Sequence, residues 1–207
     1  MNPPIKKQQQ YHHGDLKSAI LKRSAEIISE KGIEALSLRS VARELGVSHG
    51  APNRHFKSKS ELLSALVSNI WNKMQTATLQ SAQSIETETG TDDPHVRLNA
   101  LGRGYLRWAL ENKSEFQAMS HPDMRLYVDD TLKAAQEAFN EVIASAVKAA
   151  QEAGRHSGIN SSLLTLFTIS VPFGCAMLIT NALVDIDDDI QEKEDWISDL
   201  INLVVPV

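Results

Sequence analysis

The 207-residue chain has few of the features that mark secreted or membrane proteins. Its one cysteine, Cys175, excludes an internal disulfide and is typical of a reducing cytoplasm. Residues 1–10 are polar and contain no apolar signal-peptide core. The longest segment without a charged residue or histidine, 157–184, is interrupted by hydroxyl residues, Pro172 and Gly174. We therefore expect a cytoplasmic protein with no membrane partner, in which this segment is a helix buried between other helices or at an interface.

Positive charge is scarce over most of the chain but not at its beginning. Residues 1–60 hold 11 Lys/Arg and 5 Asp/Glu, a net charge of +6. The remaining residues hold 10 Lys/Arg and 21 Asp/Glu, a net charge of −11. A basic front on an acidic body favours contact between the front and a polyanion, although a solvated charged surface would have the same composition.

Alternating strand patterns are absent, and helical periodicity runs through nearly the whole chain. The sequence predicts an all-α protein of about nine or ten helices. Asp15 is expected to cap the first helix and Gly32 to end it, and the second helix, 38–45, lies between Ser37 and Gly46. A third helix is expected over about 48–56, and a capping box at 58–61 opens a long fourth one. Residues 84–95 are the clearest loop. Further helices are expected at about 96–111, 114–120, 129–153, 160–184 and 189–204.

The segment 37–56 has the pattern of a helix-turn-helix. Its two short helices are joined by Gly46, and Ala42 supplies the small residue needed where they cross. Val41, Leu45 and Val47 supply apolar contacts to the core. Such a unit presents the start of its second helix outward, where side chains can enter a DNA major groove. A helix-turn-helix that serves only for packing is the alternative.

The candidate DNA contacts follow from this geometry. Asn53 and Arg54 carry the amide and guanidinium that can make bidentate bonds to adenine and guanine edges. Pro52, which has no amide hydrogen, must lie in the first turn. The full set of predicted DNA-binding residues is Ser37, Arg39, Ser48, His49, Gly50, Ala51, Asn53, Arg54, His55, Lys57 and Lys59. Within it, Arg39, His55, Lys57 and Lys59 are expected near phosphates, with Lys6 and Lys7 trailing into a minor groove.

Three motifs resemble the N-terminal domain of the TetR/AcrR family of repressors. They are Tyr11-His12-His13-Gly14-Asp15-Leu16, the run from Ser37 to Ser48, and the run from Gly50 to Lys59, within a match over about residues 11–70. In this family position 53 is usually an aromatic residue that contacts a phosphate. Asn53 lacks that stacking surface but can still donate to a phosphate or a base, so the operator preference is expected to differ from that of close relatives.

The resemblance also implies the domain organisation. We expect a flexible arm over 1–13, a helix-turn-helix DNA-binding domain over 14–60 and an effector-binding and dimerisation domain over 61–207. The last part looks more loosely like the C-terminal domain of one branch of the family, at Tyr105-Leu106-Arg107-Trp108 and Val171-Pro172-Phe173-Gly174. Family members are typically dimers that bind an effector between helices of this domain.

Two features of the C-terminal half fit these implied roles. A stripe with small residues, suited to close helix packing, is expected at the dimer interface with the 160–184 helix as its neighbour: Leu132, Ala135, Phe139, Ile143, Ala146 and Ala150. Aromatic and methionine residues are candidates for an effector pocket, with ordinary core packing as the alternative: Tyr105, Trp108, Phe116, Met119, Met124, Phe139, Phe173 and Met177.

No catalytic or metal-binding motif in the sequence has the residue spacing that its chemistry requires. Asp185, Asp187 and Asp189 lack the glycine and terminal glutamate of a calcium loop. His12, His13 and His121 have no partners at zinc spacing, and no phosphate loop, dinucleotide fingerprint or nucleophile elbow occurs. Cys175 lies in an apolar run and is expected to be inert. We therefore expect no metal, no cofactor and no enzymatic activity.

The sequence as a whole predicts a DNA-binding transcriptional regulator, a ligand-responsive homodimeric repressor. Its partners would be a double-stranded DNA operator and a small apolar or aromatic effector. One alternative is a small-molecule-binding protein or enzyme that retains the helix-turn-helix only as a scaffold. Another is an activator or architectural protein without a ligand.

Overall fold

The structure is a computed structural model that describes residues 13–154, 156–187 and 196–204. In these ranges the chain forms eight α-helices and three 3-10 helices and no strand, so the all-α prediction is confirmed. The predicted arm, 1–13, lies outside the described residues except for His13. The first part of the predicted last helix, 189–195, also lies outside them.

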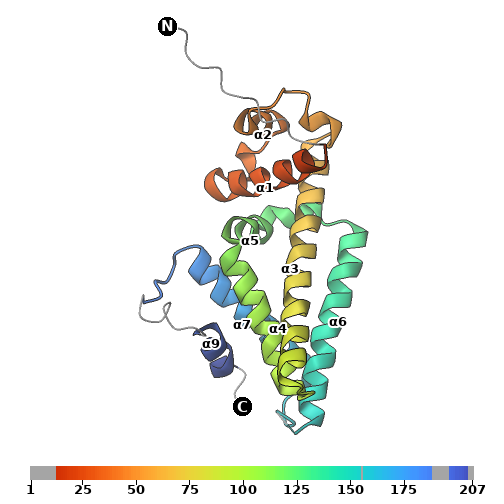
Figure 1. Cartoon of the computed structure of the whole chain (residues 1–207), viewed down its shortest axis with the longest axis vertical. Coiled ribbons are helices and arrows are strands. Elements are labelled where there is room, and N and C mark those ends of the chain that lie inside the picture. Colours follow the sequence, from red (N-terminus) through yellow and green to blue (C-terminus); the bar gives the residue numbers. More distant parts are fainter. Residues whose placement is uncertain (1–12, 155, 188–195, 205–207) are drawn as a thin grey trace.

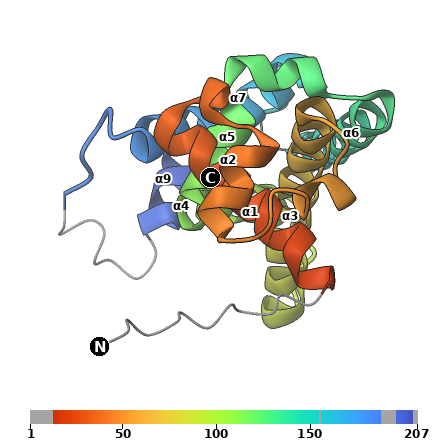
Figure 2. The ribbon, with the colours of Figure 1, turned by 90° about the horizontal axis from the view of Figure 1, so that it is seen from above.

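The helices form a small N-terminal unit on one end of a longer bundle (Figure 1). The N-terminal elements are α1 (His13–Lys31), η1 (Ile33–Ala35), α2 (Leu38–Leu45) and η2 (Pro52–Arg54). The bundle contains α3 (Lys59–Thr89), α4 (Pro94–Glu111), α5 (Lys113–Ser120), η3 (Pro122–Tyr127), α6 (Asp130–Glu152), α7 (Ser161–Thr180) and α9 (Trp196–Val204). Seen from above, α1 and α2 cover this end of the bundle, where α1 packs against α5 (Figure 2).

The ends of the first two helices follow from local chemistry. Gly32 and Gly46 have positive φ angles of 81° and 66°, which favour glycine, and each ends its helix as predicted. Gly46 has the left-handed helical conformation, whereas Gly32, with ψ of 165°, does not. Ser37 caps α2 by accepting a hydrogen bond from the Ser40 amide at 2.9 Å. The Ser37 amide in turn donates to the Ser40 hydroxyl at 2.8 Å. The prediction that Asp15 caps α1 is wrong, because the helix already begins at His13.

The third predicted helix, 48–56, is much shorter in the structure. A turn at 49–51 is followed by the 3-10 helix η2. Two residues explain the difference: Gly50 is a poor helix former, and Pro52 has no amide hydrogen to donate to the Ser48 carbonyl. The Ala51 amide bonds to Ser48 instead, at 2.9 Å, which is the tighter spacing of a turn.

Helix α3 is longer than the sequence predicts. Ser58 caps it by accepting from the Glu61 amide at 3.1 Å, while the Glu61 carboxylate accepts from the Lys57 amide rather than from Ser58. The predicted loop 84–95 is wrong, since α3 continues to Thr89 and only 90–93 separate it from α4. Gly90, with φ of 63°, ends the helix. An ion pair of 2.5 Å between Arg97 and Glu86 joins the two helices at this point.

Helix α4 runs through the centre of the bundle and packs against α3, α6, α7 and α9. Its contact with α3 is close at Gly104. A Cβ atom at this glycine would lie 2.5 Å from the Ser81 Cβ and 3.1 Å from the Thr78 Cα. The two helices therefore cross at a distance that leaves no room for a side chain at position 104.

The stripe on α6 that was expected at a dimer interface is instead mostly buried within the chain. Leu132, Phe139, Ile143, Ala146 and Ala150 are all 6% exposed or less. Their positions face the other helices of the same bundle, because α6 packs against both α4 and α7. This face of α6 is therefore not available to a second copy.

Helix α7 is where apolar side chains are exposed. Six large ones lie more than a third open to solvent: Leu163, Leu166, Phe167, Ile169, Phe173 and Leu178. Among the described residues, α7 is the one helix long and apolar enough to cross a membrane, a property that helices of soluble proteins also have. Its opposite side packs against α4, α5 and α6. In the single chain, therefore, one side of α7 is not covered by other helices.

Candidate nucleic-acid interface and ligand pocket

The surface around η2 combines exposed polar side chains with a buried anchor. Asn53 and Arg54 are exposed, while Pro52 and Phe56 on either side of them are buried. The Phe56 amide donates to the Pro52 carbonyl at 2.9 Å, which closes the turn. Because the apolar pair is fixed in the core, the backbone between holds Asn53 and Arg54 outward. The Lys17 ammonium lies 5.9 Å from the centre of the Phe56 ring.

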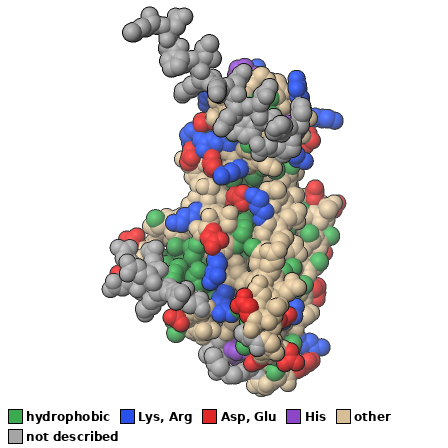
Figure 3. All heavy atoms as spheres, in the orientation of Figure 1, with side chains coloured by type: hydrophobic (Ala, Val, Ile, Leu, Met, Phe, Trp, Pro, Cys, Tyr) green, Lys and Arg blue, Asp and Glu red, His purple; other side chains and the backbone are tan. Residues whose placement is uncertain are grey.

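The other predicted DNA contacts lie on the same end of the molecule, where Lys and Arg side chains are visible in Figure 3. Six are exposed: Ser37, Arg39, Ser48, His49, Gly50 and Lys57. Ala51, His55 and Lys59 are partly buried. The Lys59 ammonium donates to the Ile33 carbonyl at 2.7 Å, so this side chain holds α3 against η1. Lys6 and Lys7 lie outside the described residues.

An ion-pair network fixes α2 on α1. The Arg23 guanidinium lies 2.7 Å from Glu26, 3.2 Å from Glu30 and 3.0 Å from Glu44 on α2. Lys31 reaches the same Glu44 carboxylate at 3.0 Å. Hydrogen bonds from Lys31 and then Arg23 hold the pKa of Glu44 below its usual value. Hydrogen bonds to Glu26 and Glu30 raise the pKa of Arg23.

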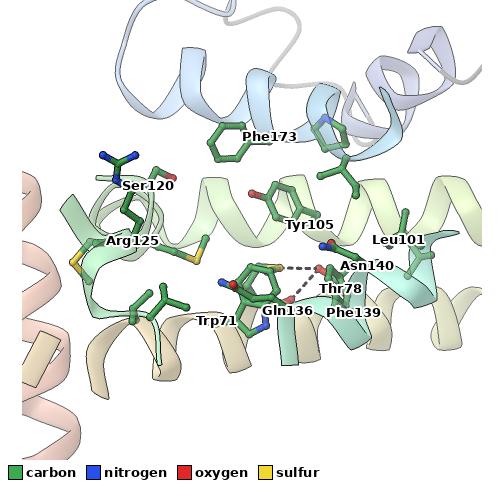
Figure 4. Close-up of a pocket in the computed structure, with 18 of the residues that line it drawn as sticks. Trp71, Thr78, Leu101, Tyr105, Ser120, Arg125, Gln136, Phe139, Asn140 and Phe173 are labelled. Atoms are coloured by element: carbon green, nitrogen blue, oxygen red, sulfur yellow. Dashed lines mark hydrogen bonds between the residues drawn. The ribbon is translucent and has the colours of Figure 1, made fainter. Parts of the chain in front are cut away.

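A cavity of about 520 Å³ lies inside the bundle, between α3, α4, η3, α6 and α7 (Figure 4). Its volume is in the range of small-molecule sites. Five of the eight predicted pocket residues line it: Tyr105, Met119, Met124, Phe139 and Phe173. Three do not: Trp108, Phe116 and Met177. Phe116 is fully buried and lies behind the wall, with its ring 6.4 Å from Tyr105 and 5.9 Å from Phe173.

One wall of the cavity comes from α3 and was missed by sequence reasoning. Val67, Trp71, Met74 and Thr78 lie along it at helical spacing. The Trp71 ring meets Phe139 edge to face, with centres 5.9 Å apart and planes at 89°. The same spacing in the sequence could have identified this line, although it is also the pattern of an ordinary core face. Because α3 begins beside η2, one continuous helix joins the cavity to the candidate DNA surface.

The cavity is mainly apolar, with a few polar groups at defined places. Gln136 and Asn140 on α6 line it, as do Ser120, His121 and Arg125 near η3. Burial raises the pKa of Tyr105 well above its usual value, so its hydroxyl stays protonated and can donate a hydrogen bond. Among the described residues that line the cavity, none is Asp or Glu.

The other reactive side chains of the described residues are arranged for neither metal binding nor thiol chemistry. In the described ranges, no three His, Cys, Asp or Glu side chains lie together as metal ligands. Burial raises the pKa of the Cys175 thiol, which keeps it protonated. Asp185 and Asp187 precede residues outside the described part of the chain, and Asp189 is one of those residues.

Comparisons with known proteins agree with this two-part layout. The family profile described as bacterial regulatory proteins, tetR family, matches residues 20–66. The profile described as tetracyclin repressor-like, C-terminal domain, matches residues 98–199. An HTH-type transcriptional repressor of Mycobacterium tuberculosis is 31% identical over 93 residues, which are 44% of this chain and 49% of that protein. The chain thus spans about half the length of the curated relatives that match it in this way.

Solved structures show the same fold over nearly the whole chain. A protein of unknown function from Rhodococcus sp. RHA1 has a TM-score of 0.70 at 25% identity, covering 96% of this chain and 95% of that one. A TetR family transcription regulator from Marinobacter aquaeolei VT8 has a TM-score of 0.70 at 17% identity, covering 91% and 92%.

An N-terminal helix-turn-helix domain joined to a helical C-terminal domain is the arrangement of tetR-type bacterial regulatory proteins, whose two domain profiles both match this chain. The two profile matches together cover most of the chain, and the chain belongs to the TetR family of bacterial regulatory proteins. The predicted family is therefore confirmed. The comparisons favour the regulator over an enzyme or binding protein that kept the helix-turn-helix only as a scaffold.

Proposed function

We propose that this chain acts in the cytoplasm as a homodimeric repressor that binds operator DNA and releases it when a small molecule enters the cavity. The observation that carries the DNA-binding part is the outward display of Asn53 and Arg54 between the buried Pro52 and Phe56. Side chains of these two types recognise base edges in the major groove. The domain boundaries at 13/14 and 60/61 are part of this proposal.

The effector would bind in the cavity and be mostly apolar or aromatic. Trp71, Tyr105, Phe139 and Phe173 line it and offer broad ring surfaces. A ligand that fits one arrangement of these walls better than another shifts the population between them. The resulting change would reach the DNA surface through α3, which forms one wall of the cavity and whose first turn lies next to η2.

Helix α5 offers a second connection between the two parts. The Ser29 hydroxyl on α1 donates a hydrogen bond to the Gln117 side-chain oxygen. The Gln117 amide donates in turn to the Thr180 carbonyl at the end of α7, at 2.7 Å. Since α5 ends at Met119 and Ser120 in the cavity wall, its position is sensed by both α1 and α7.

The part of the exposed apolar face of α7 that does not line the cavity supports the homodimer: Leu163, Leu166, Phe167 and Leu178. A contiguous apolar face of this kind on a soluble chain marks an interaction surface. Two copies related by a twofold axis would bury it, because the same patch on each copy meets its counterpart. Such a dimer would place two η2 surfaces about one DNA turn, ~34–36 Å, apart.

The test is binding of the full chain to the DNA upstream of its own gene, measured by gel shift. We expect an affinity that falls steeply between about 50 and 200 mM salt, since phosphate contacts release counterions. Arg54→Ala should cost ~1–3 kcal/mol of binding free energy and change the sequence preference. Arg43→Ala, at an exposed site on α2, is the matched control and should leave sequence preference unchanged.

Two results would contradict the proposal. Affinity that does not change with salt would exclude the phosphate-contact mode of binding. Equal weakening of Arg54→Ala on all sequences would assign this side chain to a phosphate instead of a base.

A further inference from the structure

The cavity has one charged end, and the charge there is positive. Arg125 on η3 is exposed at its edge, and Ser120 and His121 lie in the same part of the lining. Within the described residues, Arg125 makes no hydrogen bond or ion pair. Opposite charge is missing from the wall, because no described lining residue is acidic. Asp123, which lies 3.9 Å from the His121 ring nitrogen, does not line the cavity.

Two hydroxyl groups point to the same end. The Ser120 Oγ is buried and has no hydrogen-bond partner in the described structure. Figure 4 shows the Tyr105 ring crossing the cavity, with its hydroxyl turned toward the end where Ser120 and Arg125 lie. A buried hydroxyl without a partner is costly, and a ligand that supplies an acceptor removes that cost.

The rest of the cavity requires a different chemistry. Away from Arg125 its wall consists largely of Trp71, Phe139, Phe173 and aliphatic side chains. A charge placed among them would lose its hydration without compensation, whereas an apolar body gains from burial. The exposed position of Arg125 allows a charged group to stay near water while the apolar part enters.

From this division we infer that the effector is an amphipathic monocarboxylate. Its carboxylate binds to the Arg125 guanidinium and accepts hydrogen bonds from Ser120 and Tyr105, and its apolar body fills the space beside Trp71 and Phe139. A guanidinium matches a carboxylate in a bidentate fashion, and a single unpaired cation balances a single negative charge. This inference rests on the effector role proposed for the cavity and names the class of molecule.

The experiment compares matched acids and alcohols. Binding of decanoate and 1-decanol, and of 2-naphthoate and 2-naphthalenemethanol, is measured by titration calorimetry on the full chain. We expect the acid of at least one pair to bind about tenfold more tightly than its alcohol, the effect of one charge-assisted contact at a partly exposed site. Arg125→Gln should remove that preference, and Arg125→Lys should restore part of it.

The control variant is Lys113→Gln on α5, which removes one positive charge from an exposed side chain outside the cavity lining. It should retain the preference for the acid. The inference is overturned if neither acid is preferred, if no probe of either kind binds, or if Arg125→Gln keeps the preference. Tighter binding of decyl phosphate than of decanoate would also overturn it.

The same samples separate this inference from the proposed repressor function. DNA binding to the upstream region is measured with and without each acid. If an acid binds through Arg125 but DNA affinity does not change, the ligand-responsive function fails and the ligand class stands. If alcohols release DNA as well as acids do, the ligand class fails and the function stands.

Discussion

Replacing Gly104 with alanine tests how closely α3 and α4 cross beside the cavity. The new Cβ would lie 2.5 Å from the Ser81 Cβ and 3.1 Å from the Thr78 Cα. Neither atom is the end of a flexible side chain, so the helices themselves must move apart. We therefore take the upper end of the usual cost of overpacking, ~3 kcal/mol.

Alanine also stabilises a helix relative to glycine, by ~1 kcal/mol. The net loss of unfolding free energy is then ~2 kcal/mol, which for a chain of this size lowers the Tm by roughly 4–8 °C. Gly102→Ala is the matched control on the same helix. Its Cβ would come no nearer than 3.4 Å to any atom, an ordinary contact distance with two methyl groups of Ile201, so mainly the gain in helix propensity remains.

The assay is thermal unfolding followed by circular dichroism at one fixed protein concentration, because association changes the Tm of a dimer. We expect Gly104→Ala to unfold at a lower temperature than the wild type and Gly102→Ala at an equal or slightly higher one. Ser81→Gly should lower the stability of the wild type. In the Gly104→Ala background the same change should raise the stability, because it removes the Ser81 Cβ. Equal Tm values for the two alanine variants would refute the close crossing.

Three further predictions concern function and the charge network. Phe167→Glu, on the exposed face of α7, should shift the chain from dimer to monomer in light scattering while circular dichroism stays unchanged; a persistent dimer would place the interface elsewhere. In the folded state, Lys31 and Arg23 lower the pKa of Glu44. The ionised Glu44 carboxylate therefore stabilises the fold fully above its unfolded pKa, and this stabilisation is lost as the pH falls through its folded pKa. Urea unfolding should therefore show wild type more stable than Glu44→Gln at neutral pH and the difference shrinking below the ordinary value of 4.5; a constant difference would contradict this. Gln117→Leu should leave operator affinity unchanged but weaken its response to ligand, as measured by fluorescence anisotropy, whereas an unaltered response would exclude α5 as a connection.

Local chemistry was the most predictable part of the fold. Gly32 and Gly46 end their helices with positive φ angles and Ser37 donates and accepts as a cap, because these effects depend on a few neighbouring residues. The Thr- and Glu-rich end of α3 was predicted as a loop, since its composition is polar. In the structure, contact with α4 and the Glu86–Arg97 ion pair hold it as a helix, and neither is visible in local sequence.

For the cavity, the types of lining residue could be predicted from the sequence, but not which side chains point into it. Aromatic and methionine residues indicated a pocket in the C-terminal half, yet Phe116 faces the core rather than the cavity. Which side of a helix meets empty space depends on how the other helices pack, and one sequence does not contain that arrangement. Arg125 was not among the predicted pocket residues for the same reason, because only the fold brings it to the edge of an apolar cavity. The outward position of Asn53 and Arg54 could be predicted because it is fixed within one short motif, and their contact with DNA stays a prediction.

The unbroken length of α3 has a mechanical consequence. At 1.5 Å per residue, the 15 residues between Met74 in the cavity wall and Lys59 at the start of the helix span about 22 Å. Pivoting this rod by about 5° at the cavity displaces its far end by about 2 Å, more than the tolerance of a base-edge hydrogen bond. If the proposed ligand response is correct, a ligand would need to push one wall by only a fraction of an ångström, because a lever arm multiplies that displacement along α3.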